Sequence, residues 1–363
     1  MRTIAIVNQK GGCGKTTTAV NLAGCLEAEG ARVLLVDMDP QAHSTLALGI
    51  DPEDLDENLY EVLAEPAGEG RLRSVLQPAG GRLDVAPSGI VLSALEQKLA
   101  GERSDARTGR LAAALAPVAG LYDFALIDCP PNVGILTFNA LRASSEVIVP
   151  LETSHFAMHG VEKLLETIAL LSDRIAHEVV VRILPTLYDA RTRYARETLA
   201  QIRQRFGDLC FDTVIRSNVR LREAAHRGKP IIRFSRSANG AMDYTALALE
   251  VAASGHEALA HARPLGDAAL AGKTVREVVV RYRDTGAGEV RIAGDFNGWV
   301  PDKDVESSVA AEGDRRVWTK VLHLAPGTYQ YRYVVDGEWR EDPDNPRAIS
   351  GPVGERNSVL VVS

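Results

Sequence analysis

Short apolar runs alternate with longer segments of helical periodicity along residues 1–262. The apolar runs indicate buried strands, and the periodic segments indicate helices that turn one apolar face toward a sheet. This alternation predicts an α/β domain with a mostly parallel sheet and helices on both of its faces. The predicted strands are Thr3–Val7, Arg32–Asp37, Leu83–Ala86, Phe124–Asp128, Val147–Leu151 and Val179–Pro185, and the predicted helices are Lys15–Glu29, Gly134–Ala143, Gly160–Ile175, Thr192–Phe206 and Ala238–Ala262.

The pattern changes near residue 275 to a period of two, broken by turn dipeptides. Such alternation is typical of short antiparallel strands. We therefore expect a second domain, residues 275–363, folded as an antiparallel β-sandwich and joined to the first by a linker of small residues, 263–274. Its predicted strands are Val278–Tyr282, Glu289–Ile292, Val317–Leu324, Thr328–Val335 and Ser358–Val362.

Length and composition agree with two ordinary globular domains. The chain has 363 residues, of which 25% are charged and 45% hydrophobic. No apolar run approaches the roughly twenty residues of a membrane helix, and the N-terminus enters the first strand without a signal-peptide pattern. The four cysteines have neither metal-site spacing nor the density of a disulfide framework. We expect a cytoplasmic protein with no membrane partner.

Charge is distributed unevenly. The net charge is −7, yet residues 191–236 hold 12 Lys and Arg against 4 Asp and Glu, so this segment is +8 and the remainder is −15. A local basic surface for a polyanion is one interpretation. Solvated helix faces are the other, and the sequence leaves both open.

A glycine-rich segment lies between the first predicted strand and the first predicted helix. Glycines there let backbone N–H groups approach phosphates, a lysine supplies a mobile positive charge, and a hydroxyl binds Mg²⁺. We assign the last two roles to Lys15 and Thr16, and we interpret Cys13 as a spacer, with an oxidisable thiol as the alternative. The segment reads Lys10-Gly11-Gly12-Cys13-Gly14-Lys15-Thr16-Thr17.

Carboxylates end two other predicted strands. Asp37 and Asp39 follow the second strand, and Asp128 ends the strand Phe124–Asp128. A carboxylate beside a phosphate loop reaches magnesium or its water shell, so Asp128 is the candidate for the metal side, and Asp39 is a further candidate through water. Asp39 fits the positioning of the attacking water, and Asp37 fits support of the fold or of a switch. These groups predict a Mg²⁺-dependent nucleotide hydrolase.

The strict loop pattern has glycine five residues before Gly14, but Gln9 stands there and Lys10 opens the loop. With the motifs Asp37–Gln41 and Asp128–Pro131, this departure resembles the deviant Walker A loop of the ParA/Soj partitioning ATPases. The resemblance covers about residues 1–262. It implies slow ATP hydrolysis that a ParB-like partner stimulates, and a homodimer formed in the ATP state. Lys10 would then reach the partner subunit's phosphates.

The same resemblance implies non-specific DNA binding and association with the nucleoid. The family commonly has Ile-Pro-Arg-Asn where this chain has Ile215-Arg216-Ser217-Asn218, and Arg-Ser-Arg-Gly-Ala where residues 237–241 stand. Other arginines would substitute, because phosphate binding needs charge more than identity. The candidates are Arg216, Arg220, Arg222, Arg227 and Arg233. No N-terminal helix-turn-helix or C-terminal basic amphipathic helix is present, so we expect neither operator-specific repression nor membrane binding.

A hairpin is predicted in the second domain. Asp336-Gly337 is a two-residue turn signal that pairs Val335 with Glu338 and Val334 with Trp339. Alternation then puts Arg332, Val334 and Trp339 on one face and the tyrosines at 329, 331 and 333 on the other. We expect the tyrosines in the core. An exposed tryptophan beside an arginine suits a sugar ring and its hydroxyls.

Two segments, residues 290–299 and 327–339, resemble the glycogen-binding module of the AMP-activated protein kinase β subunit and of branching enzymes. The resemblance implies an immunoglobulin-like, early-set sandwich over about residues 275–363. Its contact positions for glycogen or another α-glucan correspond to Trp299, Arg332, Trp339 and Asn357, with Arg332 replacing the usual lysine. A protein-docking or structural role is the alternative, since many such modules bind no sugar.

The leading hypothesis is an ATP-dependent dimerisation switch that positions or partitions DNA, a protein or a glycan cargo. The alternative is a carbohydrate-binding regulatory protein whose ATPase domain only controls oligomerisation. Direct glycoside hydrolysis is not expected, because the sandwich offers no convincing buried pair of carboxylates. For the adenine ring, Pro185 and Asn218 are candidate contacts.

Overall fold

The computed structural model describes residues 1–65, 71–153, 161–169, 177, 179–254, 276–297, 299–302, 305–312, 315–324, 327–350 and 356–362. The chain divides into two compact units, Met1–Ala269 and Leu270–Ser363. The predicted linker, residues 263–274, lies outside the described residues. So do residues 160 and 170–175 of one predicted helix and residues 255–262 of another.

The first unit is built on a seven-stranded sheet in the order β3-β4-β2-β5-β1-β6-β7. Neighbouring strands are parallel except the antiparallel pair β3 and β4 at one edge. The six predicted strands are confirmed to within one residue at each end, and β3 was not predicted. The strands are β1 (Arg2–Ile6), β2 (Val33–Asp37), β3 (Gln77–Pro78), β4 (Leu83–Ala86), β5 (Phe124–Asp128), β6 (Glu146–Glu152) and β7 (Val180–Thr186).

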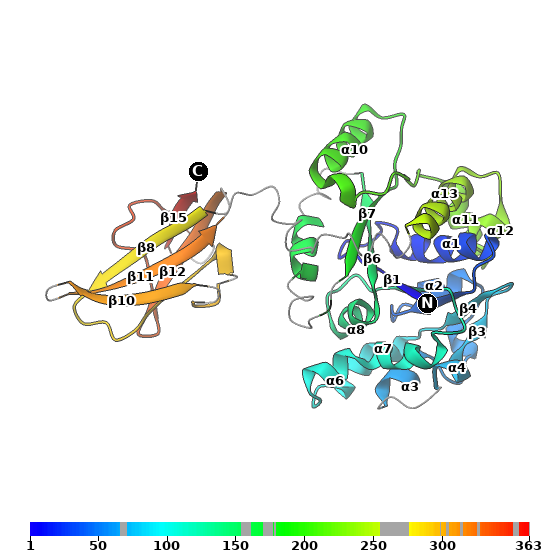
Figure 1. Cartoon of the computed structure of the whole chain (residues 1–363), viewed down its shortest axis with the longest axis horizontal. Coiled ribbons are helices and arrows are strands. Elements are labelled where there is room, and N and C mark those ends of the chain that lie inside the picture. Colours follow the sequence, from blue (N-terminus) through cyan, green and yellow to red (C-terminus); the bar gives the residue numbers. More distant parts are fainter. Residues whose placement is uncertain are drawn as a thin grey trace. The chain divides into compact units, whose positions relative to one another are not determined.

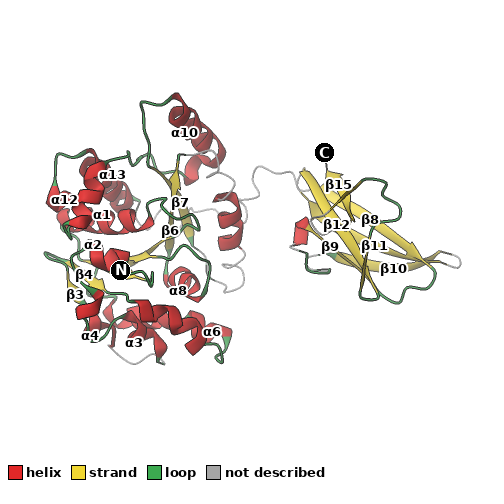
Figure 2. Cartoon of the chain, turned by 180° about the vertical axis from the view of Figure 1, so that it is seen from behind, coloured by secondary structure: helices red, strands yellow, loops and turns green. Residues whose placement is uncertain are grey.

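Helices cover both faces of this sheet, as the apolar runs predicted (Figures 1 and 2). Successive side chains of β1 enter opposite cores: Ile4 and Ile6 pack toward α1 and α13, whereas Ala5 packs with α7 and α8. The helices are α1 (Lys15–Ala28), α2 (His43–Ala47), α3 (Leu59–Ala64), α4 (Arg71–Val75), α5 (Leu95–Lys98), α6 (Ser104–Thr108), α7 (Arg110–Leu115), α8 (Ile135–Ala143), α10 (Arg193–Phe206), α11 (Val219–His226), α12 (Ile231–Phe234) and α13 (Asn239–Ala253), and residues 161–169 are also helical.

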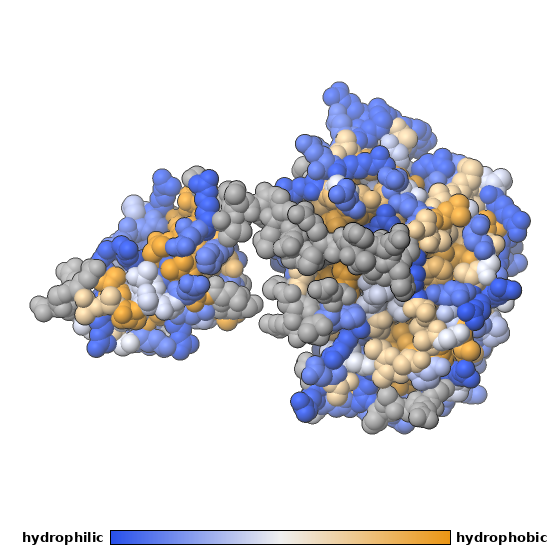
Figure 3. All heavy atoms as spheres, in the orientation of Figure 1, coloured by the Kyte–Doolittle hydropathy of each residue, from blue (hydrophilic) through white to orange (hydrophobic). Residues whose placement is uncertain are grey.

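No described helix is long and apolar enough to span a bilayer. In the view of Figure 3 the surface over α10 is largely hydrophilic, in agreement with the exposed Arg193, Arg196 and Arg203 on that helix. The helix still buries Ala195, Thr198 and Ile202 on its other face. It is thus an ordinary amphipathic helix of a globular unit.

The second unit is an antiparallel β-sandwich, as the period-two pattern predicted. One sheet has the order β10-β11-β8, and the other has β13-β12-β15-β14 with β9 also paired to β12. Tyr331 and Tyr333 are buried between them, as expected, while Tyr329 is only partly buried. The strands are β8 (Arg276–Asp284), β9 (Val290–Gly294), β10 (Glu306–Glu312), β11 (Arg315–Leu324), β12 (Gly327–Val335), β13 (Glu338–Arg340), β14 (Ala348–Ser350) and β15 (Arg356–Val362).

Candidate functional site

The glycine-rich loop connects the end of β1 to the start of α1. Gly12 and Gly14 have φ of +74° and +99°, a left-handed conformation that side chains rarely adopt. Gly14 caps α1 without a side-chain hydrogen bond, and the first turn of the helix contains no acidic residue. Its N–H groups and the positive end of the helix dipole are therefore available to an anion. This is the backbone arrangement that Gly11, Gly12, Cys13 and Gly14 predicted.

Neighbouring strand ends hold the loop in place. The Asn8 amide donates to the carbonyl oxygen of Pro150 at 2.6 Å, and the Thr186 hydroxyl donates to that of Cys13 at 2.8 Å. The Cys13 side chain is fully buried, and burial raises the pKa of its thiol. A buried, protonated thiol is a poor target for oxidation, which favours the spacer interpretation.

The two lysines of the loop differ in exposure. Lys15 is buried, and its Nζ donates to the carbonyl oxygen of Lys10 at 3.2 Å. The Lys10 side chain is 44% exposed and forms an ion pair with Glu152 at the end of β6. One ammonium group thus lies inside the loop, and the other lies at its surface.

Asp128 lies directly beside the first turn of α1. Its Oδ2 accepts hydrogen bonds from the hydroxyls of Thr16 and Ser44, each at 2.7 Å. Its Oδ1 is buried and has no hydrogen-bond partner among the described residues. Burial raises the pKa of this carboxyl, and the charge of Asp39 adds to the effect, whereas the two hydroxyls and Lys15 oppose it.

An unpaired carboxylate oxygen beside a threonine hydroxyl fits Mg²⁺, which takes one or two protein oxygens and otherwise binds water and phosphate. Among the described residues no group of three or more His, Cys, Asp or Glu is placed to hold a metal. An all-protein cage is therefore not what this region offers. Asp128 and Thr16 fit an ion that is bound together with the nucleotide.

Asp37 and Asp39 have different surroundings. Asp37 is fully buried, and its Oδ2 accepts from the Thr45 backbone N–H at 2.9 Å and hydroxyl at 2.7 Å. Burial and the neighbouring carboxylate of Asp128 raise the pKa of Asp37. Its bonds fix the start of α2, which supports the predicted role in the fold. Asp39 is 7% exposed and accepts from the Gln41 backbone N–H at 3.0 Å.

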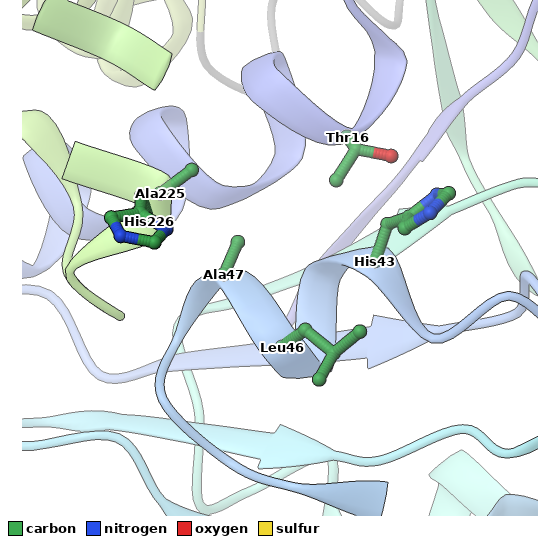
Figure 4. A pocket seen from close by; sticks show the side chains of 6 residues that line it. All are labelled: Thr16, His43, Leu46, Ala47, Ala225 and His226. Atoms are coloured by element: carbon green, nitrogen blue, oxygen red, sulfur yellow. The ribbon is translucent and has the colours of Figure 1, made fainter. Parts of the chain in front are cut away.

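A pocket of about 460 Å³ adjoins the loop on the side of α2 and α11 (Figure 4). It was not predicted, nor was the contact of Ser44 with Asp128. The sequence offered one signal for this contact: Ser44 lies only five residues after Asp39, a predicted site residue. The lining residues are Thr16, His43, Leu46, Ala47, Ala225 and His226.

The five arginines proposed for DNA fall into two groups. Arg216 binds the Asp243 carboxylate through Nε and Nη2, and Arg233 binds Glu27 and the carbonyl oxygens of Ala79 and Gly80. Both guanidinium groups are therefore engaged within the chain: Arg216 binds a carboxylate of α13, and Arg233 attaches α12 to its neighbours. By contrast, Arg220, Arg222 and Arg227 are exposed on α11 or directly after it.

In the second unit the predicted hairpin is present. Val334 pairs with Trp339 and Val335 with Glu338. Asp336 and Gly337 have φ of +49° and +90°, as a two-residue turn with two left-handed residues requires.

The two tryptophan rings proposed for sugar lie together. Their centroids are 6.1 Å apart with planes at 42°, and Trp339 is 42% exposed. Arg332 donates from Nη2 to the Trp339 carbonyl oxygen at 2.7 Å. Asn357 donates to Gln330 Oε1 at 3.1 Å, so it joins this face through β12. Residues 351–355 lie outside the described residues.

Taken together, the parallel sheet, the phosphate loop and Asp128 define an ATPase of the phosphate-loop α/β class. A family model described as "AAA domain" matches residues 1–181. The chain belongs to the ParA/Soj family of ATPases. It is 42% identical over 253 residues to the sporulation initiation inhibitor protein Soj of Bacillus subtilis, which covers 69% of this chain and 98% of that protein. It is 38% identical to the chromosome partitioning protein ParA of Myxococcus xanthus, covering 69% and 87%.

Solved structures agree with this assignment. The chain is 33% identical to cobyrinic acid a,c-diamide synthase from Mycobacterium smegmatis with bound ADP and magnesium, with a TM-score of 0.60, covering 72% of this chain and 98% of that one. The septum site-determining protein MinD of Pyrococcus horikoshii, complexed with Mg-ADP, is 25% identical with a TM-score of 0.54, covering 69% and 95%. A second family model, described as the glycogen recognition site of AMP-activated protein kinase, matches residues 276–363.

Proposed function

We propose that this chain binds ATP with Mg²⁺ and acts as an ATP-dependent dimerisation switch that positions a cargo. The observation that carries the proposal is the pair of loop lysines, one buried and one exposed. A single loop needs one lysine for its own phosphates. The exposed Lys10 suits a second site, in the partner subunit of a dimer.

Each residue of the loop has a distinct part in this proposal. Lys15 and the N–H groups of residues 11–17 bind the phosphates, and Thr16 and Asp128 hold the metal ion, Asp128 directly or through water. An ion held there would supply positive charge against the phosphate oxygens. Asp39 orients the attacking water, since phosphoryl transfer depends on position and charge more than on covalent help.

The ion pair of Lys10 with Glu152 bears on dimer formation. In a single subunit the exposed ammonium is held by a carboxylate of its own chain. Exposed ion pairs contribute only about 0–1 kcal/mol, so phosphates of a second subunit can displace Glu152 readily. ATP in the partner subunit then favours the dimer, and loss of phosphate favours separation.

For the cargo we propose DNA, bound non-specifically through the exposed arginines of the α11 region. Such binding would place the protein on the nucleoid. We also propose a ParB-like partner that stimulates ATP hydrolysis. Arg220, Arg222 and Arg227 support it, since they are exposed, whereas Arg216 and Arg233 have partners within the chain.

The test of the switch is ATP turnover by the wild type, Lys10→Ala and Asp39→Ala, with DNA or glycogen added in parallel. We expect both variants to lose about 100-fold or more in kcat, and Asp39→Ala to remain dimeric with ATP because its phosphate contacts are intact. The matched controls are Lys98→Ala and Asp56→Ala, which remove exposed residues of the same types. Wild-type turnover in Asp39→Ala would remove the water-positioning role.

A second candidate function is favoured by the tryptophan pair: a carbohydrate-binding regulatory protein whose ATPase domain only sets oligomerisation. Two rings 6.1 Å apart with an arginine beside them are suited to an α-glucan. We expect the full chain to cosediment with glycogen, and Trp299→Ala and Trp339→Ala to lose this while keeping the wild-type melting temperature within a few degrees. Retained cosedimentation in both variants would point to a protein-docking role for the sandwich.

The two functions differ in where the protein goes in a cell. A fluorescent fusion on the nucleoid supports the positioning switch, and one on glycogen granules supports the regulatory protein.

A further inference from the structure

Trp299 has an unusual backbone conformation. Its φ is +61°, which is rare for a large side chain and costs on the order of 1–3 kcal/mol. The residue follows the short helical turn η5 (Asp295–Asn297), and its N–H donates to the carbonyl oxygen of Gly294 at 2.9 Å. Such strain persists only where the surroundings hold the residue in place.

One carboxylate holds the indole ring to the sheet. Asp295 Oδ1 accepts from Nε1 of Trp299 at 3.2 Å, and its Oδ2 accepts from the backbone N–H of Gln330 at 2.7 Å. The pairing of β9 with β12 ends at Gly294 and Tyr331. Asp295 therefore accepts the backbone N–H of Gln330 just beyond the last residue pair of these two strands. The indole is thereby tied to β12, the strand that carries Arg332.

The same connection reaches the fourth proposed sugar contact. The Gln330 side chain accepts from Asn357 at 3.1 Å. Gln330 therefore bonds to Asp295 through its backbone and to Asn357 through its side chain. Trp299 and Asn357 lie at the two ends of this chain of bonds, and neither Asp295 nor Gln330 is itself among the proposed sugar contacts.

We propose that Asp295 is the positioning residue of the sugar platform, which fixes the plane of Trp299 relative to Trp339. The inference rests on the proposed glucan binding. A platform of two rings binds a sugar chain more tightly when their mutual angle, here 42°, is set beforehand. If the ring becomes ordered only during binding, the conformational entropy that it loses lowers the affinity. A charged acceptor also holds an indole N–H more firmly than a neutral one.

The experiment compares the full-length wild type with Asp295→Asn and Asp295→Ala. Two indoles this close give a pair of opposite bands in far-ultraviolet circular dichroism. Trp299→Ala and Trp339→Ala identify these bands, because each variant removes them and leaves the buried Trp318 in place. Asp284→Asn is the matched control, since Asp284 is another acidic residue that accepts backbone N–H bonds in a turn of this unit.

We expect Asp295→Ala to lose the paired bands and to bind glycogen about 5- to 10-fold more weakly, with a melting temperature within a few degrees of the wild type. Asp295→Asn, which keeps one acceptor oxygen, should fall between Asp295→Ala and the wild type, and Asp284→Asn should behave as the wild type. Wild-type bands and wild-type glycogen affinity in Asp295→Ala would overturn the proposal. If the wild type itself bound no glycogen, the glucan function would fail. The circular dichroism bands alone would then test the positioning role. Their loss in Asp295→Ala would support it, and their persistence would overturn it.

Discussion

At the scale of single residues, the burial of Asp128 is the basis of the metal role that we propose for it. Its Oδ2 is engaged by two hydroxyls, while Oδ1 is buried without a partner among the described residues. A buried acceptor without a bond costs about 1–3 kcal/mol, more when it is charged. A cation at Oδ1 would remove that cost, and this is the physical basis of the metal role that we propose for Asp128.

Asp128→Asn tests this at small structural cost. The amide oxygen can still accept from Thr16 and Ser44, so the substitution removes mainly the charge and Oδ1. We expect Mg²⁺-dependent binding of ADP to weaken about 10- to 100-fold, with metal-free ADP binding little changed. The measurement is calorimetric titration with ADP, with and without Mg²⁺, and an unchanged Mg²⁺ effect would argue against metal binding at Asp128.

The role of a residue could be predicted from the sequence where it belongs to a short motif, but not where its partner is distant in the sequence. The loop and Asp128 follow from the sequence because glycines, a lysine and a strand-ending aspartate are local signals. The bonds of Arg216 to Asp243 and of Arg233 to Glu27 join residues distant in sequence. No local pattern distinguishes such arginines from free ones.

At the scale of elements, α2 and α11 meet through glycine backbones. A Cβ on Gly228 would lie 2.6 Å from the Gly49 Cα, and Gly228 has φ of +63°. The turn after α2 thus packs directly on the turn after α11. Since Ser44 of α2 binds Asp128, the contact between the two glycines links the phosphate loop to α11, which carries the exposed arginines.

We therefore expect Gly228→Ala to lower the free energy of unfolding by about 1–3 kcal/mol, because the added methyl group meets backbone rather than a flexible side chain. Thermal unfolding of the apo protein measures it. Gly120→Ala is the control, because nothing lies within 4 Å of its added Cβ and we expect a change below about 0.5 kcal/mol. Equal melting temperatures for the two variants would contradict this packing.

Elements were predictable in proportion to their burial. The six strands found from sequence alone each contain a run of mostly apolar, buried residues. β3 has two residues including Pro78, β10 is exposed along most of its length, and β14 has three residues. Strands that bury little carry no hydrophobic period, and only the neighbouring strand defines them.

At the scale of the whole molecule, the net charge of −7 does not decide polyanion binding, because positive charge gathers around α10 to α12. Only the exposed part of it is available to phosphate. The effective surface that we propose is the α11 group, Arg220, Arg222 and Arg227.

Replacing these three arginines by alanine should weaken duplex binding in the presence of ATP. A dimer carries two copies, so the slope of log K against log salt should shrink by up to about 5, at roughly 0.9 per phosphate contact. The control replaces three exposed cations elsewhere in the same unit, Arg73, Lys98 and Arg103. An equal loss in both triple variants would mean that only total charge matters, and no loss would remove the α11 surface.

The central claim is that Lys10 completes the site of a second subunit, and a mixing experiment tests it most directly. Lys10→Ala and Lys15→Ala are each expected to be inactive in ATP turnover. A mixed dimer regains one complete site, with Lys15 from one subunit and Lys10 from the other. Half of randomly paired dimers are mixed and each has one complete site of two, so an equal mixture should recover about a quarter of wild-type turnover. Wild-type turnover by Lys10→Ala alone, or a mixture no more active than its two components, would contradict the account.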